Sequence, residues 1–243
     1  MKIIKLNATE STNSFLKNLS QSSNLENHTV VVSEKQTNGR GQQDQKWLSE
    51  PFKNLTFSVF NSFDTLKIEH QKHLNFAVSI AIYNVLSNKK IAKLSIKWPN
   101  DIMSANKKIC GILIENTFAG SKIKKTVVGI GLNVNQTEFP KSIKNVTSLK
   151  LETNTDHNLT ALLKEILKEI QTQILKLENN RFKSLEEKYV SVLYKKDIPS
   201  MFKNSNGLLF LGIITGISKT GNLLIQLENN SIKEFGIKEV LFL

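Results

Sequence analysis

The sequence predicts an α+β fold, with a mixed sheet and flanking helices followed by a small β domain. Strand-like and helix-like hydrophobic patterns alternate over residues 1–196, whereas residues 197–243 hold only short strand-like runs separated by Gly, Asn and Ser. A chain of 243 residues is long enough for one main domain and one small appendage. We therefore expect one domain over residues 1–196 and a second over residues 197–243.

Hydrophobic spacing and capping residues place the elements of the main domain. A first strand is expected over residues 1–7, and a short helix begins at Ser11 or Thr12, which are good N-cap residues. Asn158 is the expected N-cap of the longest helix, over residues 159–177. The other expected elements are strands over residues 29–33, 55–59, 94–98, 109–114 and 126–134, helices over 74–85 and 182–192, and a hairpin turn at 122–125 behind Gly120.

The C-terminal segment has the pattern of an SH3-like barrel. Its expected strands are residues 208–215, 222–228 and 231–236. We expect its three phenylalanines, Phe210, Phe235 and Phe242, to fill the core of this small barrel.

Composition indicates an ordinary soluble protein, with 40% hydrophobic and 22% charged residues. No apolar run approaches the ~20 residues of a membrane span. Charge interrupts the apolar residues at the N-terminus, so these residues do not form a signal peptide. The single cysteine, Cys110, excludes an internal disulfide and suits a reducing compartment. We expect a cytoplasmic protein with no membrane partner.

The formal charge of +12 favours polyanions, nucleotides or an acidic protein as partners. Most of this charge is lysine spread along the chain rather than an arginine-rich block. We therefore favour a solvated lysine-rich surface over dedicated nucleic-acid binding.

The most informative stretch is Lys-Trp-Pro-Asn-Asp at residues 97–101, followed by Lys108 and Gly111. Proline has no N–H for a sheet ladder and favours an extended predecessor, so a strand should end at Trp98. Asn100 and Asp101 then form a turn. The pattern predicts an amide, a carboxylate and an ammonium at the ends of neighbouring strands.

A long polar loop, residues 34–50, follows a strand and is of a length usually found in functional or disordered segments. Gly39 and Gly41 flank Arg40, so the backbone can approach a ligand while the guanidinium faces a carboxylate or phosphate. The spacing of a P-loop is absent. Trp47 is either a core residue or a platform for a purine.

Glycines at 129 and 131 interrupt an apolar strand, which indicates a bulge or the close approach of another group. The pattern lacks the third glycine and following helix of a dinucleotide site. Asn133, which follows, carries both the donor and the acceptor that an adenine edge requires. Ser11, Thr12 and Asn13 are most simply a helix cap, although a cap can also hold a polar ligand.

Other reactive residues offer no site. Cys110 lies on an apolar strand and is interpreted as a core thiol. The four histidines are too scattered for a metal cluster or a catalytic triad: His28, His70, His73 and His157.

Taken in this order, the motifs resemble the biotin protein ligases, also called biotin–[acetyl-CoA-carboxylase] ligases. The Lys-Trp-Pro-Asn-Asp element with its following lysine and glycine is the most specific part of the likeness, which covers nearly the whole chain. The resemblance implies a fold like that of class II synthetases and biotin–lipoate ligases. The matching stretches are Ser11–Asn13, Gln36 with Gly39–Gly41, Trp47, Lys97–Asp101, Lys108 with Gly111, Gly129–Asn133 and Gly216–Gly221.

The resemblance implies a reaction in two steps that uses ATP and Mg²⁺, with biotin as substrate. Biotin's carboxylate attacks the α-phosphorus of ATP to give biotinyl-5′-AMP and pyrophosphate. A lysine of a biotin carboxyl carrier domain of a carboxylase then attacks the mixed anhydride and releases AMP. The ligands of the metal are unknown at this stage.

Roles follow from position in the matching motifs. The implied catalytic residues are Lys108, Arg40 and Asp101, with Asp101 orienting or deprotonating the carrier lysine. The implied biotin-binding residues are Ser11, Thr12, Asn13, Gln36, Arg40, Gly41, Gln42, Lys108 and Gly111. The implied ATP- and adenylate-binding residues are Arg40, Trp47, Asn100, Lys108 and Asn133.

The chain departs from the family at two places. The family's loop commonly continues with further arginines, but this chain has Gln42, Gln43, Asp44 and Gln45, so we expect leakier retention of the adenylate. Some members begin with a winged-helix DNA-binding domain. Here the catalytic pattern starts within the first dozen residues, so we expect a short form with no DNA partner.

Two rival interpretations remain open. A lipoate–protein ligase shares the fold and the adenylation chemistry. A non-catalytic protein that binds nucleic acid through its β domain would need aromatic residues on strand faces, and the available phenylalanines are better used in a core. The oligomeric state, monomer or homodimer, is not decided by the sequence.

Overall fold

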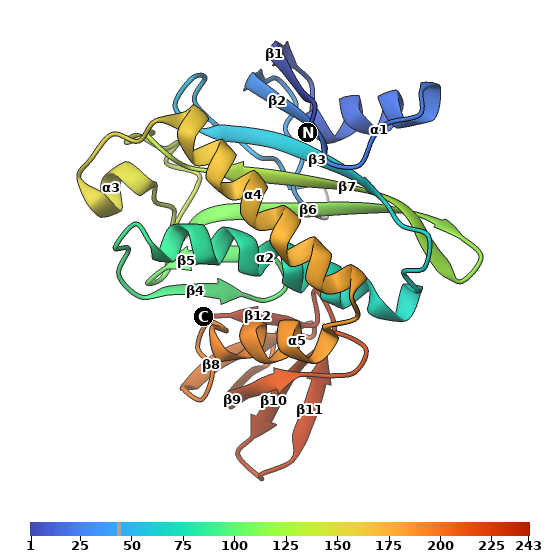
Figure 1. The fold of residues 1–243 in the computed structure, drawn as a ribbon. Helices are drawn as coiled ribbons and strands as arrows, with labels where there is room; N and C mark the ends of the chain where they lie inside the picture. The colour runs from blue at the N-terminus through green and yellow to red at the C-terminus, as the bar shows by residue number, and fades with distance from the viewer. Residues whose placement is uncertain (43–44) are drawn as a thin grey trace.

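The computed structural model describes residues 1–42 and 45–243 and has a main sheet of seven strands and a second sheet of five (Figure 1). This architecture confirms the predicted α+β fold with a mixed sheet. The main-domain elements are β1 (Ile3–Thr9), α1 (Thr12–Ser22), β2 (Thr29–Gln36), β3 (Leu55–Ser62), the short 3₁₀ helix η2 (Ile68–His70), α2 (Gln71–Ser87), β4 (Leu94–Lys97), β5 (Asp101–Ser104), β6 (Lys107–Ala119), β7 (Lys122–Leu132), α3 (Leu149–Thr153), α4 (Leu159–Glu178) and α5 (Phe182–Ser191).

The strand order of the main sheet is β1-β2-β3-β7-β6-β5-β4. The pair β1–β2, joined by α1, is parallel, and the other pairs of this sheet are antiparallel. The central strands β3, β7 and β6 therefore bring residues that are far apart in the chain side by side.

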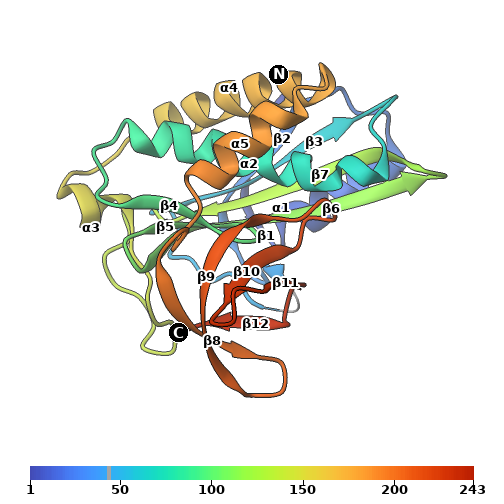
Figure 2. The same cartoon turned by 90° about the horizontal axis from the view of Figure 1, so that it is seen from below.

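The two faces of the main sheet carry two separate hydrophobic cores, because successive residues of a strand point to opposite faces. Val30 and Val128 pack with α2 and α4, whereas their neighbours Val31 and Val127 pack with Leu16 of α1. Figure 2 shows α2 and α4 on one side of the sheet and α1 on the other.

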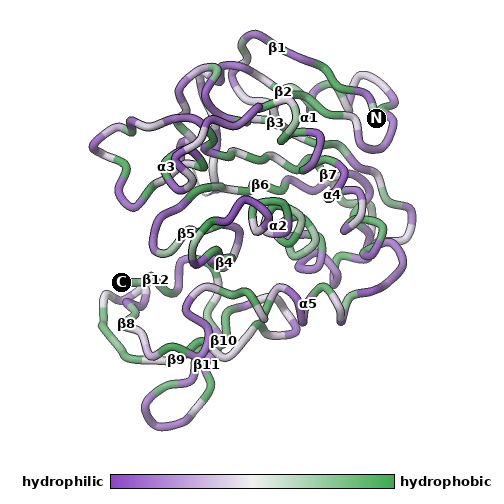
Figure 3. The backbone as a smooth tube through the Cα atoms, turned by 60° about the vertical axis from the view of Figure 1, so that its left-hand side comes forward, coloured by the Kyte–Doolittle hydropathy of each residue, from purple (hydrophilic) through white to green (hydrophobic). Residues whose placement is uncertain are grey.

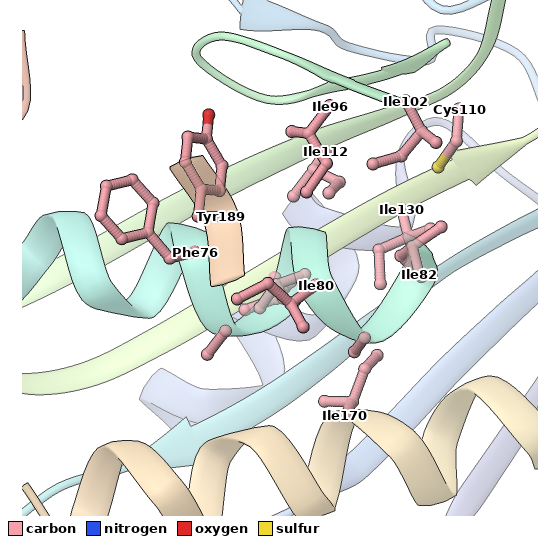
Figure 4. Close-up of a cluster of buried hydrophobic side chains, with 14 of the residues drawn as sticks. Phe76, Ile80, Ile82, Ile96, Ile102, Cys110, Ile112, Ile130, Ile170 and Tyr189 are labelled. Carbon is pink, nitrogen blue, oxygen red and sulfur yellow. The ribbon is translucent and has the colours of Figure 1, made fainter. Parts of the chain in front are cut away.

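The larger core is centred on α2, which is buried around most of its circumference. Its side chains meet those of β6 and β7 on one side and of α4 on the other, as the labelled residues Ile80, Ile112, Ile130 and Ile170 show (Figure 4). Figure 3 shows the hydropathy along the chain: α2 is largely hydrophobic, whereas the loop next to α3 is largely hydrophilic.

Capping residues define the helix starts as the sequence predicted. The Ser11 hydroxyl accepts from the Ser14 N–H, and the Asn158 side chain accepts from the Ala161 N–H at 2.9 Å.

The predicted hairpin turn at residues 122–125 is wrong. These residues belong to β7 and pair with β6, and the turn falls at Gly120, whose positive φ of 56° suits glycine.

The second sheet consists of β8 (Pro199–Asn204), β9 (Leu209–Ile217), β10 (Leu223–Leu227), β11 (Ile232–Phe235) and β12 (Val240–Phe242), all antiparallel. It confirms the predicted SH3-like domain, although β8 and β12 were not predicted. Its core includes Phe202, Phe210 and Phe235, whose rings stack with centroids 5.5 and 5.3 Å apart. The Trp98 indole N–H donates to the Gly221 carbonyl at 3.0 Å and ties this sheet to the main domain.

No helix within residues 1–42 and 45–243 is both long and apolar enough to cross a membrane.

Candidate active site

A small cavity of about 50 Å³ lies where the start of α1, the loop after β2, and the strands β6 and β7 meet. Its lining is mostly polar, although the strands beneath it are mostly apolar. The sequence-predicted residues that line it are Ser11, Thr12, Asn13, Gln36, Arg40, Gly41, Gln42, Trp47, Asn100, Lys108 and Gly111.

The α1 end of the cavity is a chain of hydrogen bonds. The Thr12 N–H and hydroxyl both donate to Gln36 Oε1, at 2.8 and 3.1 Å. The Ser58 hydroxyl lies 2.7 Å from Thr12 Oγ1 and 2.6 Å from Asn13 Oδ1. These side chains are largely buried, and their hydrogen bonds fix the orientation of their donors and acceptors. The cavity is therefore preorganised to bind a polar group.

Glycines form the floor of the cavity because larger residues would collide with its walls. A Cβ at Gly129 would lie 2.3 Å from Asn13 Oδ1, and one at Gly131 would lie 2.3 Å from Cε2 of Trp47. The prediction that these strand glycines mark a close approach is confirmed. The Trp47 indole lies over β7, and its N–H is buried with no hydrogen-bond partner in the described structure.

An ion pair stands at the other end of the cavity. Lys108 Nζ lies 2.7 Å from Asp101 Oδ1, and both side chains are partly exposed. The strand register explains this contact, because Lys108 of β6 pairs with Met103, which is only two residues along β5 from Asp101. Lys108 also lies 5.8 Å from the Trp47 ring, so one ammonium faces both the aromatic wall and the carboxylate.

The Pro99–Asn100 turn is held from behind. The Pro99 carbonyl accepts from Asn75 Nδ2 at 2.6 Å and from the Tyr189 hydroxyl at 2.9 Å. The Asn100 side chain donates to the carbonyl of Ile112 on β6. As the sequence predicts, an amide, a carboxylate and an ammonium meet at neighbouring strand ends.

A second cavity of about 420 Å³ adjoins the ion pair. Asp101 and Lys108 lie on its wall with Lys97, Lys144 and Lys195. Burial lowers the pKa of Lys97, with Lys108 and Lys195 acting in the same direction and Asp101 opposing them. The arrangement offers anions two cavities that share Lys108 as a lining residue.

Residues 6–133 match a family described as the biotin/lipoate A/B protein ligase family. The chain belongs to this family. The fold is similar to that of a biotin protein ligase from Aquifex aeolicus in complex with biotin and ATP, at 30% identity and a TM-score of 0.80, over 99% of this chain and 97% of that one. The resemblance to biotin protein ligases is confirmed.

This chain spans about two thirds of the length of two curated relatives. The bifunctional ligase/repressor BirA of Bacillus subtilis is 27% identical over 85% of this chain, and the match spans 63% of that protein. The BirA of Escherichia coli is 26% identical over 89% of this chain and 67% of its own length. A biotin protein ligase from Leishmania major, at 17% identity and a TM-score of 0.64, shows the shared fold.

Two sequence-predicted residues of this family member lie outside the small cavity. Asp101 lines the second cavity instead. Asn133, just beyond β7, is buried with its side-chain N–H₂ donating to the Thr147 carbonyl at 3.0 Å, while its Oδ1 has no partner among the described residues. Gln43 and Asp44, which were predicted to weaken adenylate retention, lie outside the described residues.

Sequence reasoning missed two polar residues of the site. Ser58 was predicted only as a position in the strand 55–59, whose alternation is typical of a half-buried strand, whereas the structure buries Ser58 fully beside α1. Glu115 follows the predicted strand 109–114, and its carboxylate lies 2.7 Å from Arg40 Nη2 and 2.9 Å from Asn13 Nδ2. Its partners are distant in sequence, so no local pattern could reveal them.

The remaining reactive side chains stay apart from this site. Cys110 is fully buried, and burial raises the pKa of its thiol far above the usual range, so the interpretation as a core thiol is confirmed. Within residues 1–42 and 45–243, no three His, Cys, Asp or Glu side chains are grouped as a metal site. Mg²⁺ often binds through substrate phosphates and only one or two carboxylates, a role that Asp101 could fill.

Proposed function

We propose that this chain is an ATP-dependent biotin protein ligase that forms biotinyl-5′-AMP and transfers biotin to a lysine of a carboxylase's biotin carboxyl carrier domain. The observation that carries this proposal is the position of Lys108, which lines both cavities and contacts Asp101 in the second one. The similar biotin protein ligase from Aquifex aeolicus is in complex with biotin and ATP, which supports the choice of substrates.

The small cavity suits biotin's ureido ring, which presents one carbonyl acceptor and two N–H donors. The hydroxyls of Ser11 and Thr12 and the amides of Asn13 and Gln36 supply the complementary groups. Gly41, Gln42 and the backbone of Gly111 complete this wall. Its volume of about 50 Å³ is smaller than the roughly 300–1,000 Å³ of ligand pockets, so the loop around Arg40 and Trp47 must move to admit biotin.

In the first step, a biotin carboxylate oxygen bonds to the α-phosphorus of ATP, and the bond to the pyrophosphate oxygen breaks. Negative charge develops on the phosphoryl oxygens, where Lys108 and Arg40 stabilise it. Mg²⁺ bound with ATP would neutralise the triphosphate. Trp47 would stack on the adenine, Asn133 would read its edge after a local rearrangement, and Asn100 would lie near the phosphates.

In the second step, the carrier lysine's amine attacks the carbonyl carbon of the anhydride and AMP leaves. The amine must lose a proton as the amide forms, and Asp101 faces the second cavity from which that lysine would enter. We assign Asp101 to orienting this amine or accepting its proton. The lysines of the same cavity suit an acidic carrier surface.

The test is pyrophosphate release by the purified chain with ATP and Mg²⁺, supplied with either biotin or lipoate. We expect pyrophosphate release with biotin but not with lipoate, and we expect Lys108→Ala to lose this release. Lys107→Ala is the matched control, because this neighbouring lysine is exposed and outside both cavities. Release with lipoate instead would assign the chain to the lipoate branch, and release with neither would overturn the proposal.

A further inference from the structure

Arg40 lies in the loop after β2, where it pairs with Lys46 across the loop, and its guanidinium contacts a carboxylate of the sheet. The described hydrogen bonds within residues 39–47 close the loop on itself, from the Trp47 N–H to the Gly39 carbonyl and from the Gly41 N–H to the Gln45 carbonyl. The Arg40–Glu115 pair, at 2.7 Å, instead reaches across to β6. It therefore couples the position of Arg40 to the sheet, beside the packing of the Trp47 ring over β7.

Glu115 is held firmly enough to serve as an anchor. The oxygen that contacts Arg40 also accepts from Asn13 Nδ2 at 2.9 Å, and the other oxygen lies 3.5 Å from Lys17 Nζ. The Glu115 side chain is 20% exposed, and that of Arg40 is 41% exposed. The carboxylate is thus the fixed member of the pair and the guanidinium the movable one.

The contact leaves most of the guanidinium available. An arginine has five N–H donors, and Glu115 takes one of its nitrogens, Nη2. Two cations, Arg40 and Lys17, surround one carboxylate, so this edge of the cavity keeps a net positive charge. Arg40 can therefore hold Glu115 and an anionic ligand at the same time.

We propose that Glu115 is a positioning residue that holds the Arg40 guanidinium over the cavity and thereby helps to retain the adenylate. The inference rests on the proposed function and extends it to a residue that makes no assigned contact with substrate. Glu115 acts through Arg40, so its removal should matter only while Arg40 is present.

The experiment measures the dissociation rate of biotinyl-5′-AMP from the wild type, Glu115→Ala, Arg40→Ala and the double variant. We expect Glu115→Ala to release the adenylate about fivefold faster, a size typical of a partly exposed charged pair. The double variant should release it no faster than Arg40→Ala alone. Glu115→Gln, which keeps an acceptor oxygen, should lie between Glu115→Ala and the wild type.

Two comparisons exclude a merely structural effect. Asn13→Ala should not add fully to Glu115→Ala, because Asn13 Nδ2 helps to fix the Glu115 carboxylate that contacts Arg40. Glu165→Gln, which removes a surface ion pair with Lys89, should leave the dissociation rate unchanged. An unchanged rate in Glu115→Ala, or additivity of Glu115→Ala with Arg40→Ala, would overturn the proposal.

A second readout is independent of the chemistry. Trypsin should cleave unliganded Glu115→Ala after Lys46 faster than it cleaves the wild type, because the loop has lost the contact of Arg40 with β6. If the wild type forms no adenylate but Glu115→Ala still accelerates cleavage, the proposed function fails and the anchoring of the loop stands. If the wild type is active and neither readout changes, the role of Glu115 alone fails.

Discussion

The two faces of the main sheet are built differently. On the α2–α4 face, apolar side chains form the larger core, and Leu74, Ala77 and Ile82 are fully buried. On the α1 face, the hydrophobic cluster is small and the cavity lies beside it. Buried hydroxyl and amide side chains form hydrogen bonds with one another there. The difference teaches that stability and binding are assigned to opposite sides of the same strands, so variants should separate them.

Loss of the Lys108 ammonium should produce the largest effect, and on activity alone. Lys108→Ala removes the cation shared by both cavities, and we expect pyrophosphate release about 10²–10³-fold slower. Because Lys108 is partly exposed and its partner Asp101 can be solvated, the melting temperature should change little. Enzyme kinetics and thermal unfolding of the same preparation check both halves of this prediction.

A cavity in the α2–α4 face should have the opposite effect. Ile80→Ala removes a side chain that is 1% exposed, and we expect the free energy of unfolding to fall by about 2–4 kcal/mol. Activity per folded molecule should be unchanged at a temperature well below the melting point. Urea unfolding measures the loss, with the exposed Leu175→Ala of α4 as control. A large change in KM for biotin would show that the two faces are not separable.

Gly131→Ala tests the floor of the cavity. Its new Cβ would meet the Trp47 ring, so the indole must shift, and we expect the KM for ATP to rise about tenfold. Stability should fall by about 1 kcal/mol, as for a modest overpacking. Tryptophan fluorescence should report the movement. Gly216→Ala, where a Cβ would meet nothing, should change neither quantity.

Lys97→Met should give the smallest effect of the four variants, and it should stabilise the protein, whereas most substitutions destabilise. Burial lowers the pKa of Lys97 from its ordinary 10.5, so the folded state is penalised for holding the charge. The methionine variant should therefore be more stable by about 0.5–1 kcal/mol at pH 7. This gain should shrink as pH rises toward 10.5, where the unfolded chain also loses the proton. Urea unfolding across pH checks it, and a pH-independent gain would refute the electrostatic cause.

The sequence predicted what short-range patterns control. The helices α1 and α4 were located because their caps and apolar spacing are local, and the cavity residues were found because they lie in compact motifs. The short strands β5 and β12 were missed because they are too short for an alternating pattern to be distinctive. Glu115 was missed because its contact with Asn13 depends on how α1 packs on β6. The burial of Asn133 depends on its hydrogen bond to the Thr147 carbonyl, which no local pattern shows.

Lys108 borders both cavities, so one ammonium can contact a reactive intermediate while it forms and while it is consumed. Under the proposed function, the anhydride is made and consumed at the same ammonium. The anhydride need not move from one site to another, because the carrier lysine enters from the side of Asp101. A reactive acyl group that stays where it was formed meets little water before its acceptor arrives. A protein of this kind would keep its intermediate intact by immobility rather than by rapid transfer.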